Sequence, residues 1–498
     1  MNAKFEQLAD RARELTDLQS IMRNLNWDQE TMMPSKGVQF RARQSATLAA
    51  ICHAKLIDPV FGDLLRDLGS RNGLDVWQRA SVREAQREYD KAVLLPPELV
   101  RELAETVPLS YAAWVEARKN SDFKAFCPWL RKVFDLKKRQ AKCLNLGSTP
   151  YDSLLDDWEP GATYDEIRIL FKKLRPQLTE LVDRVIGSTR VLKRSRIAGA
   201  YPVAKQKEFG GRILTAMGFD WDAGRLDVSP HPFCCGVTPY DVRITTRYSE
   251  TDFGEALFGV IHEGGHALYE QGLDPETWGT PVCETISLGI HESQSRLWEN
   301  CVGRSSEFWE FWFPEAQKAF PGQLDDIAPA EFLRAINRVK PTLIRVEADE
   351  LTYGLHVILR TEIEHALLED QFPVEELENV WNEKMEEYLG IRPSNAAEGV
   401  LQDVHWSHGL VGYFPTYLLG TLYATQFFQS ACNEIGGLKD AIRTGRMIEL
   451  RDWLRQNIHR QGRLLSAAEL VQKVTGQALR SEYFTDYLSD KYGQLYGL

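Results

Sequence analysis

The chain has 498 residues, of which 43% are hydrophobic and 26% are charged, and its formal net charge is −12. This composition is typical of a globular protein with enough apolar residues for a large core. The negative charge argues against nucleic acid or an anionic membrane as the main partner, because both attract clustered positive charge.

Helical periodicity dominates the sequence. Apolar residues recur at three- and four-residue steps over 5–25, and a second amphipathic run covers 163–186. Pro176 lies inside the second run, and because proline lacks the backbone N–H that a helix needs, we expect the helix to kink or break there. Two more helices are expected over 375–388 and 447–458.

The cysteines and the start of the chain bear on its location. None of the eight cysteines forms a Cys-x-x-Cys motif, and the adjacent pair at 234–235 suits neither a zinc knuckle nor an ordinary disulfide. We interpret them as reduced thiols, which predicts a cytoplasmic protein. The first residues are already charged, unlike the apolar core of a signal peptide, so no targeting segment is expected.

One region departs from the helical pattern. Residues 241–248 alternate between two faces and include four β-branched side chains, which predicts a strand. The preceding segment, 226–237, is a candidate partner for it. If 241–248 formed a sheet edge, a substrate backbone could pair with it. With no internal repeat or linker, one large helical domain with a small sheet is the expected architecture.

Residues 251–272 predict a helix that carries a metal-binding pattern. His262 and His266 are four positions apart, so both rings project from one helix face and can bind one tetrahedral zinc ion. Glu263 follows the first histidine directly, which places its carboxylate beside the metal as a general base. Gly264 and Gly265 should cost about 1 kcal/mol each relative to alanine. They therefore indicate close approach by a substrate or by another helix.

A third zinc ligand is expected on the next helix. Glu292 lies in a polar cluster, 291–295, that interrupts an otherwise apolar helical pattern, as in the lining of a cavity. Two histidines from one helix and a glutamate from the next form the gluzincin arrangement. Bound zinc lowers the pKa of a water molecule, from which Glu263 takes a proton as the water attacks a peptide carbonyl. These residues predict a zinc peptidase.

The longest uncharged segment is 404–433. A membrane-spanning helix needs about 20 mostly apolar residues. Here proline, glutamine, threonine and tyrosine interrupt the segment, so we expect a buried helix under the active site and no membrane partner.

Five further motifs resemble those of the carboxypeptidase Taq family of zinc metallocarboxypeptidases. The motifs are H-P-F at 231–233, D-x-R-x-T at 241–245, H-E-S-Q at 291–294, I-R-x-x-A-D at 344–349 and G-x-x-Q-D-x-H-W at 399–406. They occur in the family's order around the metal motif, and none departs from the family pattern. Other familial stretches extend the resemblance over nearly the whole chain.

The resemblance implies a mainly α, saddle-shaped metallopeptidase with a deep active-site groove and a small β-sheet beside the zinc helix. It implies a single domain, 1–498, in which helices of about 1–200 roof the groove and about 201–498 form the catalytic part. It also implies one Zn²⁺ per subunit, with Co²⁺ in some members, and a homodimer. The expected activity is release of single amino acids from peptide C-termini with broad preference.

The family motifs nominate the remaining site residues. Arginine is the natural partner of a free C-terminal carboxylate, and Arg345 is the candidate. Its alternative role is a helical ion pair with Asp349, four residues later, which could also hold the arginine in place. The other candidates for binding the substrate or the oxyanion are His231, His405, Tyr413 and Tyr417. The residues expected to orient ligands are Asp241, Arg243, His291, Asp349, Gln402 and Asp403.

Two alternative functions stay open at this point. The same zinc site would serve another gluzincin specificity, such as an oligopeptidase or a dipeptidyl carboxypeptidase. A metal-binding protein that holds peptides without turnover is a further alternative, although the presence of Glu263 argues against it.

Overall fold

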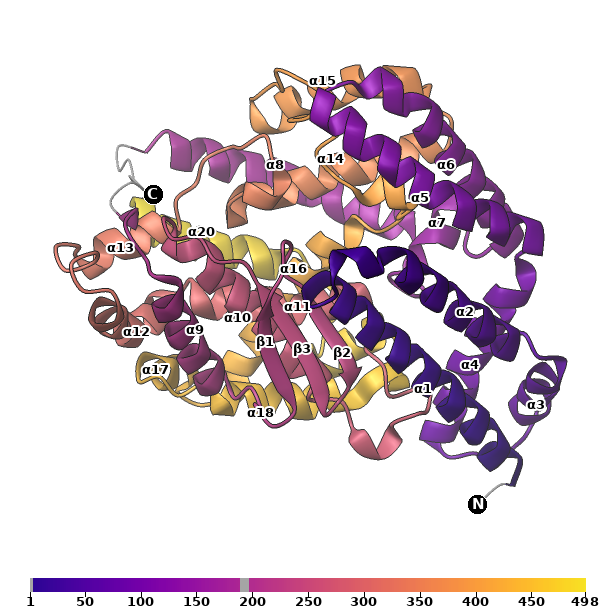
Figure 1. The fold of residues 1–498 in the computed structure, drawn as a ribbon. Helices are drawn as coiled ribbons and strands as arrows, with labels where there is room; N and C mark the ends of the chain where they lie inside the picture. The colour runs from indigo at the N-terminus through magenta and orange to yellow at the C-terminus, as the bar shows by residue number, and fades with distance from the viewer. Residues whose placement is uncertain (1–2, 189–196) are drawn as a thin grey trace.

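The computed structural model describes residues 3–188 and 197–498, which form many helices and one small sheet (Figure 1). The N-terminal helices are α1 (Ala3–Thr31), α2 (Val38–Leu56), α3 (Pro59–Gly69), α4 (Val76–Leu94), α5 (Pro97–Asn120), α6 (Phe123–Leu144), α7 (Pro150–Leu155) and α8 (Tyr164–Ile186). The later helices are α9 (Val203–Met217), α10 (Phe253–Glu270), α11 (Leu288–Arg296), α12 (Ser306–Ala319), α13 (Pro329–Ile336), α14 (Glu350–Leu368), α15 (Leu377–Leu389), α16 (Pro415–Glu434), α17 (Leu438–Arg443), α18 (Ile448–Asn457), α19 (Ala467–Thr475) and α20 (Glu482–Tyr496). The predicted fold class, mainly α with a small sheet beside the helix that carries His262 and His266, is confirmed.

Three strands form the sheet, in the order β1–β3–β2. The central strand β3 (Asp241–Thr246) pairs in parallel with β1 (Gly224–Val228) and antiparallel with β2 (Cys234–Thr238). The segment 226–237 therefore contributes to both neighbours of β3. The strand predicted over 241–248 is confirmed as β3, but it is not a sheet edge: β1 and β2 pair with its two sides, so substrate pairing with β3 is not available.

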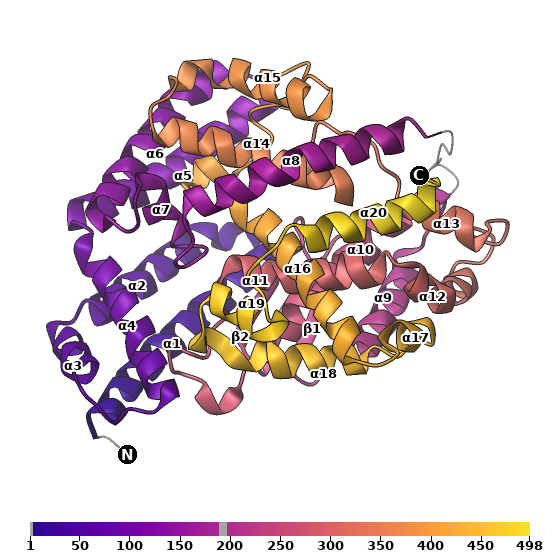
Figure 2. The same cartoon turned by 180° about the vertical axis from the view of Figure 1, so that it is seen from behind.

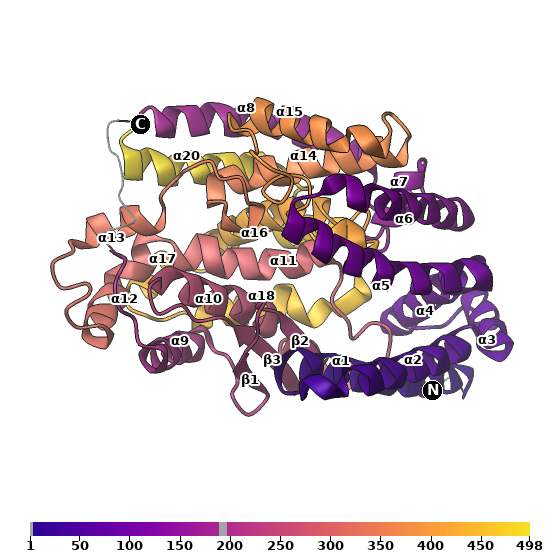
Figure 3. The same ribbon diagram turned by 45° about the horizontal axis from the view of Figure 1, so that its top comes forward.

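Helix α1 packs against this sheet, and Figure 3 shows α1 beside β2. The ring of Trp27 is buried beneath two guanidinium groups, those of Arg225 at 5.0 Å and Arg243 at 4.5 Å. Arg23 donates to the carbonyl of Gly236 at 3.2 Å and to Glu284 at 2.8 Å. Cation–π contacts and a partly buried ion pair therefore hold the N-terminal helix on the sheet.

The predicted break at Pro176 is wrong, because α8 continues from Tyr164 to Ile186. A proline in a helix interior costs about 3 kcal/mol. On both sides of it, α8 buries Phe171, Leu174 and Leu178, each stabilising the fold by roughly 1.5–3 kcal/mol. Packing against α14 and α20 thus outweighs the missing hydrogen bond. The helices predicted over 375–388 and 447–458 are confirmed as α15 and α18.

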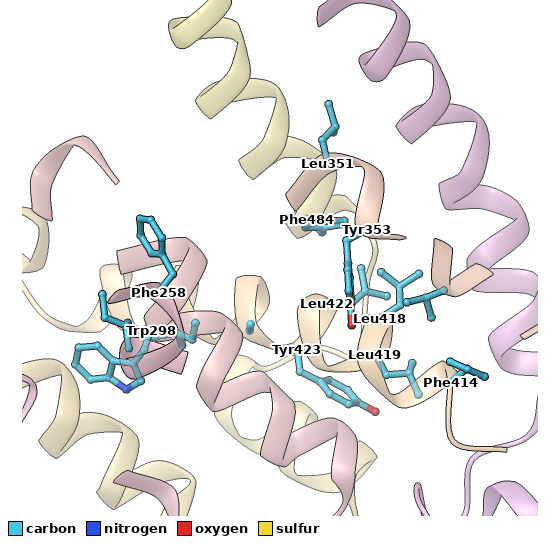
Figure 4. Packing of buried hydrophobic residues seen from close by; sticks show 14 of the residues in the cluster. Phe258, Trp298, Leu351, Tyr353, Phe414, Leu418, Leu419, Leu422, Tyr423 and Phe484 are labelled. Atoms are coloured by element: carbon cyan, nitrogen blue, oxygen red, sulfur yellow. The ribbon is translucent and has the colours of Figure 1, made fainter. Parts of the chain in front are cut away.

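The core of the catalytic part is a stack of three helices, α10, α11 and α16, with the sheet on one side of α10. Figure 2 shows α18, α19 and α20 around α16, and all three helices contact it. Helix α16 is buried along most of its length, and Figure 4 shows its residues Leu418, Leu419 and Leu422 inside the core. This confirms the buried helix expected within 404–433. Within the described part of the chain, every helix is too short or too polar to span a membrane.

Candidate metal centre and active site

Helix α10 presents both histidines from one face. The Asp252 side chain caps the helix by accepting the Gly254 N–H at 2.8 Å, and the ring centroids of His262 and His266 are 4.9 Å apart. A Cβ atom added at Gly265 would lie 2.6 Å from the carbonyl oxygen of Gln294. Gly265 therefore lets the backbone of α10 approach α11, whereas a Cβ atom at Gly264 would lie 2.5 Å from the side chain of Leu214 on α9.

Glu292 on α11 completes the site. Its Oε2 atom lies 3.7 Å from Nε2 of His262 and 3.5 Å from Nε2 of His266. The three ligand atoms all lie within 4.8 Å of one another. Bonds of about 2.0–2.2 Å to a tetrahedral zinc ion place ligand atoms roughly 3.4 Å apart, so this donor set fits zinc. The three residues predicted from sequence are brought together.

Charged neighbours orient the ligands. His262 Nδ1 is 2.9 Å from Oε2 of Glu299, and Arg296 donates to Oε1 of Glu292 at 2.7 Å. The predicted orienting residue His291 stacks on His266, with ring centroids 4.3 Å apart, and its Nε2 is 3.0 Å from Glu270. The carboxylate contacts fix the orientation of the two imidazole rings, and Arg296 favours the ionised form of Glu292, which is the form that binds metal.

Glu299 and Arg296 are absent from the sequence prediction. Glu299 lies on the π-helical turn η4 (Leu297–Gly303) that continues α11, and the side chains of Arg296 and Glu299 are largely buried, at 16% and 12% exposed. Their spacing in the sequence could have identified them. Arg296 and Glu299 follow Glu292 by four and seven residues, so helical geometry puts all three near one face. Although burial acts in the opposite direction, the hydrogen bond to His262 and then the guanidinium groups of Arg296 and Arg304 hold the pKa of Glu299 well below its usual range.

Glu263 is buried beside the ligands on the same helix. Burial raises the pKa of its carboxyl to about 7. A general base works best when its pKa is near the operating pH, so this environment suits proton transfer at neutral pH.

Arg345 lies in a buried ion-pair cluster. Asp403 Oδ1 accepts from Nε of Arg345 at 3.0 Å and lies 2.9 Å from Nη2, while its Oδ2 accepts from Arg360 at 2.6 Å. Gln402 Oε1 accepts from the Arg345 backbone N–H at 2.8 Å and from Arg360 at 2.7 Å. Two of the predicted orienting residues, Gln402 and Asp403, thus fix the arginine.

The predicted ion pair between Arg345 and Asp349 is wrong. Arg345 begins the short 3₁₀ turn η5 (Arg345–Glu347), and the chain is extended at Ala348. Residues four apart share a face only in a continuous helix. Asp349 instead caps α14 by accepting the backbone N–H groups of Leu351 and Thr352.

Aromatic side chains surround the same guanidinium group. His405 Nε2 is 3.0 Å from the hydroxyl of Tyr417, whose ring lies 4.9 Å below the Arg345 guanidinium carbon. The ring of Tyr413 is 5.3 Å from that of His405. Tyr353, absent from the prediction, accepts from Arg345 at 3.1 Å.

Tyr353 also connects this cluster to the metal ligands, because the Arg296 guanidinium lies 4.4 Å from its ring. From Glu292, contacts therefore run through Arg296 and Tyr353 to Arg345.

The structure places the other candidates at the sheet. Arg243 pairs with Asp241 at 2.8 Å and donates to Asn24 of α1 at 2.8 Å, which joins the sheet to the N-terminal helix. His231 lies between β1 and β2 and is exposed, and its backbone carbonyl accepts from Ser229 at 2.5 Å. The eight cysteines are all free.

Comparisons with known proteins agree with this site. The family model described as carboxypeptidase Taq (M32) metallopeptidase matches residues 7–492. The chain is 44% identical to thermostable carboxypeptidase 1 of Thermus thermophilus, with 99% of both chains covered, and 39% identical to carboxypeptidase 1 of Bacillus subtilis, with 95% of this chain and 94% of the relative covered.

Solved structures show the same relationship. The M32 carboxypeptidase from Deinococcus radiodurans matches with a TM-score of 0.97 and 39% identity over 100% of both chains. Trypanosoma cruzi metallocarboxypeptidase 1 matches with a TM-score of 0.93 and 37% identity, covering 98% of this chain and 99% of that one. The chain therefore belongs to the carboxypeptidase Taq (M32) family of metallopeptidases and is a metallocarboxypeptidase.

Proposed function

We propose that the protein is a zinc-dependent carboxypeptidase that releases single amino acids, with broad preference, from peptides with a free C-terminus. The observation that carries the proposal is the buried triad of His262, His266 and Glu292, whose ligand atoms are spaced as zinc requires. A zinc ion held there supplies Lewis-acid polarisation of the scissile carbonyl.

Glu263 moves the proton in this proposal. Its carboxylate takes a proton from the attacking water and passes it to the leaving amine. A pKa of about 7, set by burial, lets the same group accept the proton and then release it near neutral pH.

Arg345 recognises the substrate's C-terminal carboxylate. Asp403 and Tyr353 engage three of the five N–H groups of its guanidinium. Within the described part of the chain, this leaves one N–H on Nη1 and one on Nη2, the pair that binds a carboxylate in bidentate fashion. Because Arg345 is 5% exposed, such a bond would be shielded from water and therefore strong.

His405, Tyr413 and Tyr417 bind the substrate or the oxyanion. Burial and the neighbouring Arg345 lower the pKa of His405 to about 3, so its imidazole is neutral at pH 7 and can form a neutral hydrogen bond. The Tyr417 hydroxyl, bonded to His405, is a suitable donor to a developing oxyanion.

Several properties of the proposal rest on the family resemblance. We infer Zn²⁺, with Co²⁺ as a substitute, one ion per subunit, a homodimer and a cytoplasmic location. We also infer one domain, in which helices of about 1–200 roof the groove over the catalytic part. His231 contributes to substrate binding, and Asp241 and Arg243 help to position the sheet that carries this part of the site.

Peptide pairs that differ only in the C-terminal group test the function. Each peptide is incubated with the protein as a free acid and as an amide, with and without a chelator, and the products are identified by mass spectrometry. Stepwise loss of single residues from the acid only, abolished by chelation and restored by zinc, is expected. Release of dipeptides or internal cleavage of both forms would instead identify a dipeptidyl carboxypeptidase or an oligopeptidase.

A further inference from the structure

Glu159 lies in the connection between α7 and α8, far from the metal helices in sequence, yet its carboxylate contacts both α11 and α16. Oε2 accepts the backbone N–H of Gly289 at 3.0 Å, and Oε1 accepts the hydroxyl of Tyr423 at 3.0 Å. Glu159 is 1% exposed. A single carboxylate therefore joins the N-terminal helical part to two helices of the catalytic part.

The start of α11 fits tightly against this segment. A Cβ atom added at Gly289 would lie 2.5 Å from Oε2 of Glu159. The backbone N–H of Leu288 donates to the carbonyl of Trp158 at 2.9 Å, and the Trp158 indole donates to the carbonyl of Val411 at 2.9 Å. The position of the first turn of α11 is thus fixed by hydrogen bonds from outside the helix.

We propose that Glu159 is a positioning residue for the metal ligand Glu292, an inference that rests on the proposed zinc-dependent function. Gly289 precedes Glu292 by three residues, one helical turn, and α11 is only nine residues long. A displacement of its first turn therefore reaches the ligand almost undiminished.

Three variants separate this role from general stability. Glu159→Leu keeps the approximate volume but removes both acceptors. Glu159→Gln is the conservative variant, because its carbonyl can accept from Gly289 while its NH₂ donates to the Tyr423 hydroxyl, which accepts as well as donates. Glu364→Leu is the matched control: Glu364 is also fully buried and accepts from Tyr151 at 2.7 Å, Trp406 at 2.9 Å and Gly412 at 2.8 Å.

The measurements are zinc affinity, by competition with a colour-forming chelator, and the visible absorption spectrum of the cobalt-loaded protein. Loss of a group that orients a ligand typically weakens metal binding by about 10- to 100-fold. We expect at least a tenfold loss and an altered cobalt spectrum for Glu159→Leu, and values near those of the wild type for Glu159→Gln. Glu364→Leu should lower the thermal midpoint while its zinc affinity stays within about threefold of the wild type.

Wild-type zinc affinity in Glu159→Leu, or an equal loss in Glu364→Leu, would overturn the positioning role. If Glu159→Leu fails to fold, Glu159→Asp replaces it, because the shorter side chain keeps the charge but withdraws the carboxylate from Gly289. The proposed function is judged separately: wild-type protein that binds zinc without releasing C-terminal residues contradicts that function and leaves the measured role of Glu159 intact.

Discussion

The Nδ1 atom of His262 and the Oε2 atom of Glu299 are 2.9 Å apart, which gives the first metal-binding histidine a buried carboxylate partner. An ionised carboxylate can only accept a hydrogen bond, so it favours the proton on Nδ1, and in the neutral ring this tautomer leaves Nε2 free to bind the metal. Glu299 in turn is held by Arg296 at 3.3 Å and Arg304 at 3.1 Å.

Glu299→Gln should therefore weaken zinc binding by about tenfold, the lower end of the range for such partners. Zinc titration against a competing chelator measures the effect. Glu315→Gln, in a pair with Arg212 and Lys318 at the surface, is the control and should bind zinc like the wild type. Equal affinities for all three proteins would show that Glu299 does not support His262.

Glu263→Gln should lower kcat by about 10²- to 10⁴-fold, because an amide cannot accept the proton of the attacking water. Zinc content should remain that of the wild type, since Glu263 is not a ligand in the triad. Glu255→Gln, in the first turn of the same helix and paired with Arg247, should keep full activity. Substantial turnover by Glu263→Gln would contradict the proposed mechanism.

Arg345→Lys should lower kcat/KM for a peptide with a free C-terminus by at least about tenfold, because a lysine cannot form the bidentate contact. Cleavage of the matched amide should change little, so the ratio of the two rates reports the effect. Arg212→Lys, at the surface in an ion pair with Glu315, serves as the control. An unchanged ratio would remove Arg345 from carboxylate recognition.

Gly420→Ala should impair the metal site sterically. A Cβ atom at Gly420 would lie 2.6 Å from both Cβ and Cγ of Glu292. We expect a loss of zinc affinity of about tenfold or more, as for other changes that displace a ligand. Gly493→Ala on α20, where the added Cβ meets nothing within 4 Å, should instead be neutral or stabilise the protein by roughly 0.5–1 kcal/mol. Chelator competition and thermal unfolding distinguish the two variants.

The buried carboxyl of Glu364 should make the stability of the folded protein depend on pH. Burial raises its pKa from 4.5 to about 7. Between these values the unfolded chain releases the proton and the folded protein keeps it, so stability decreases as the pH rises through this window, by about 3 kcal/mol in all. Glu364→Gln does not titrate at this position. With chelator present throughout, the thermal midpoint of the wild type should fall relative to that of the variant from pH 5 to pH 8. A wild-type midpoint that stays constant or rises relative to that of Glu364→Gln would refute this role of Glu364.

Local spacing was sufficient to predict the parts of the site that depend on a single helix. His262, Glu263 and His266 lie on one turn of α10, so their relative placement follows from helical geometry alone. Glu292 was found because polar residues interrupted an apolar helix. The buried helix α16 followed from composition in the same way.

Relationships between distant segments could not be predicted this way. Asp403, the partner of Arg345, is 58 residues away in sequence, whereas local spacing offered only Asp349, four residues away, as an alternative ion-pair partner. The central position of β3 depends on β1 pairing across an intervening strand, which the alternation of side chains within β3 does not reveal. The break expected at Pro176 does not occur. The free-energy cost of a proline in a helix can be estimated from local sequence, whereas the compensating packing comes from α14 and α20.

The confinement of α11 limits how this site can change during evolution. Gly420 on one side and Gly265 on the other bring the backbones of α16 and α10 against it, so the helix cannot move closer to either neighbour. Replacement of Glu292 by the shorter aspartate could not be compensated by a movement of the helix toward the histidines. The choice of third ligand is therefore inherited with the fold, and new substrate preferences must arise from residues farther from the metal.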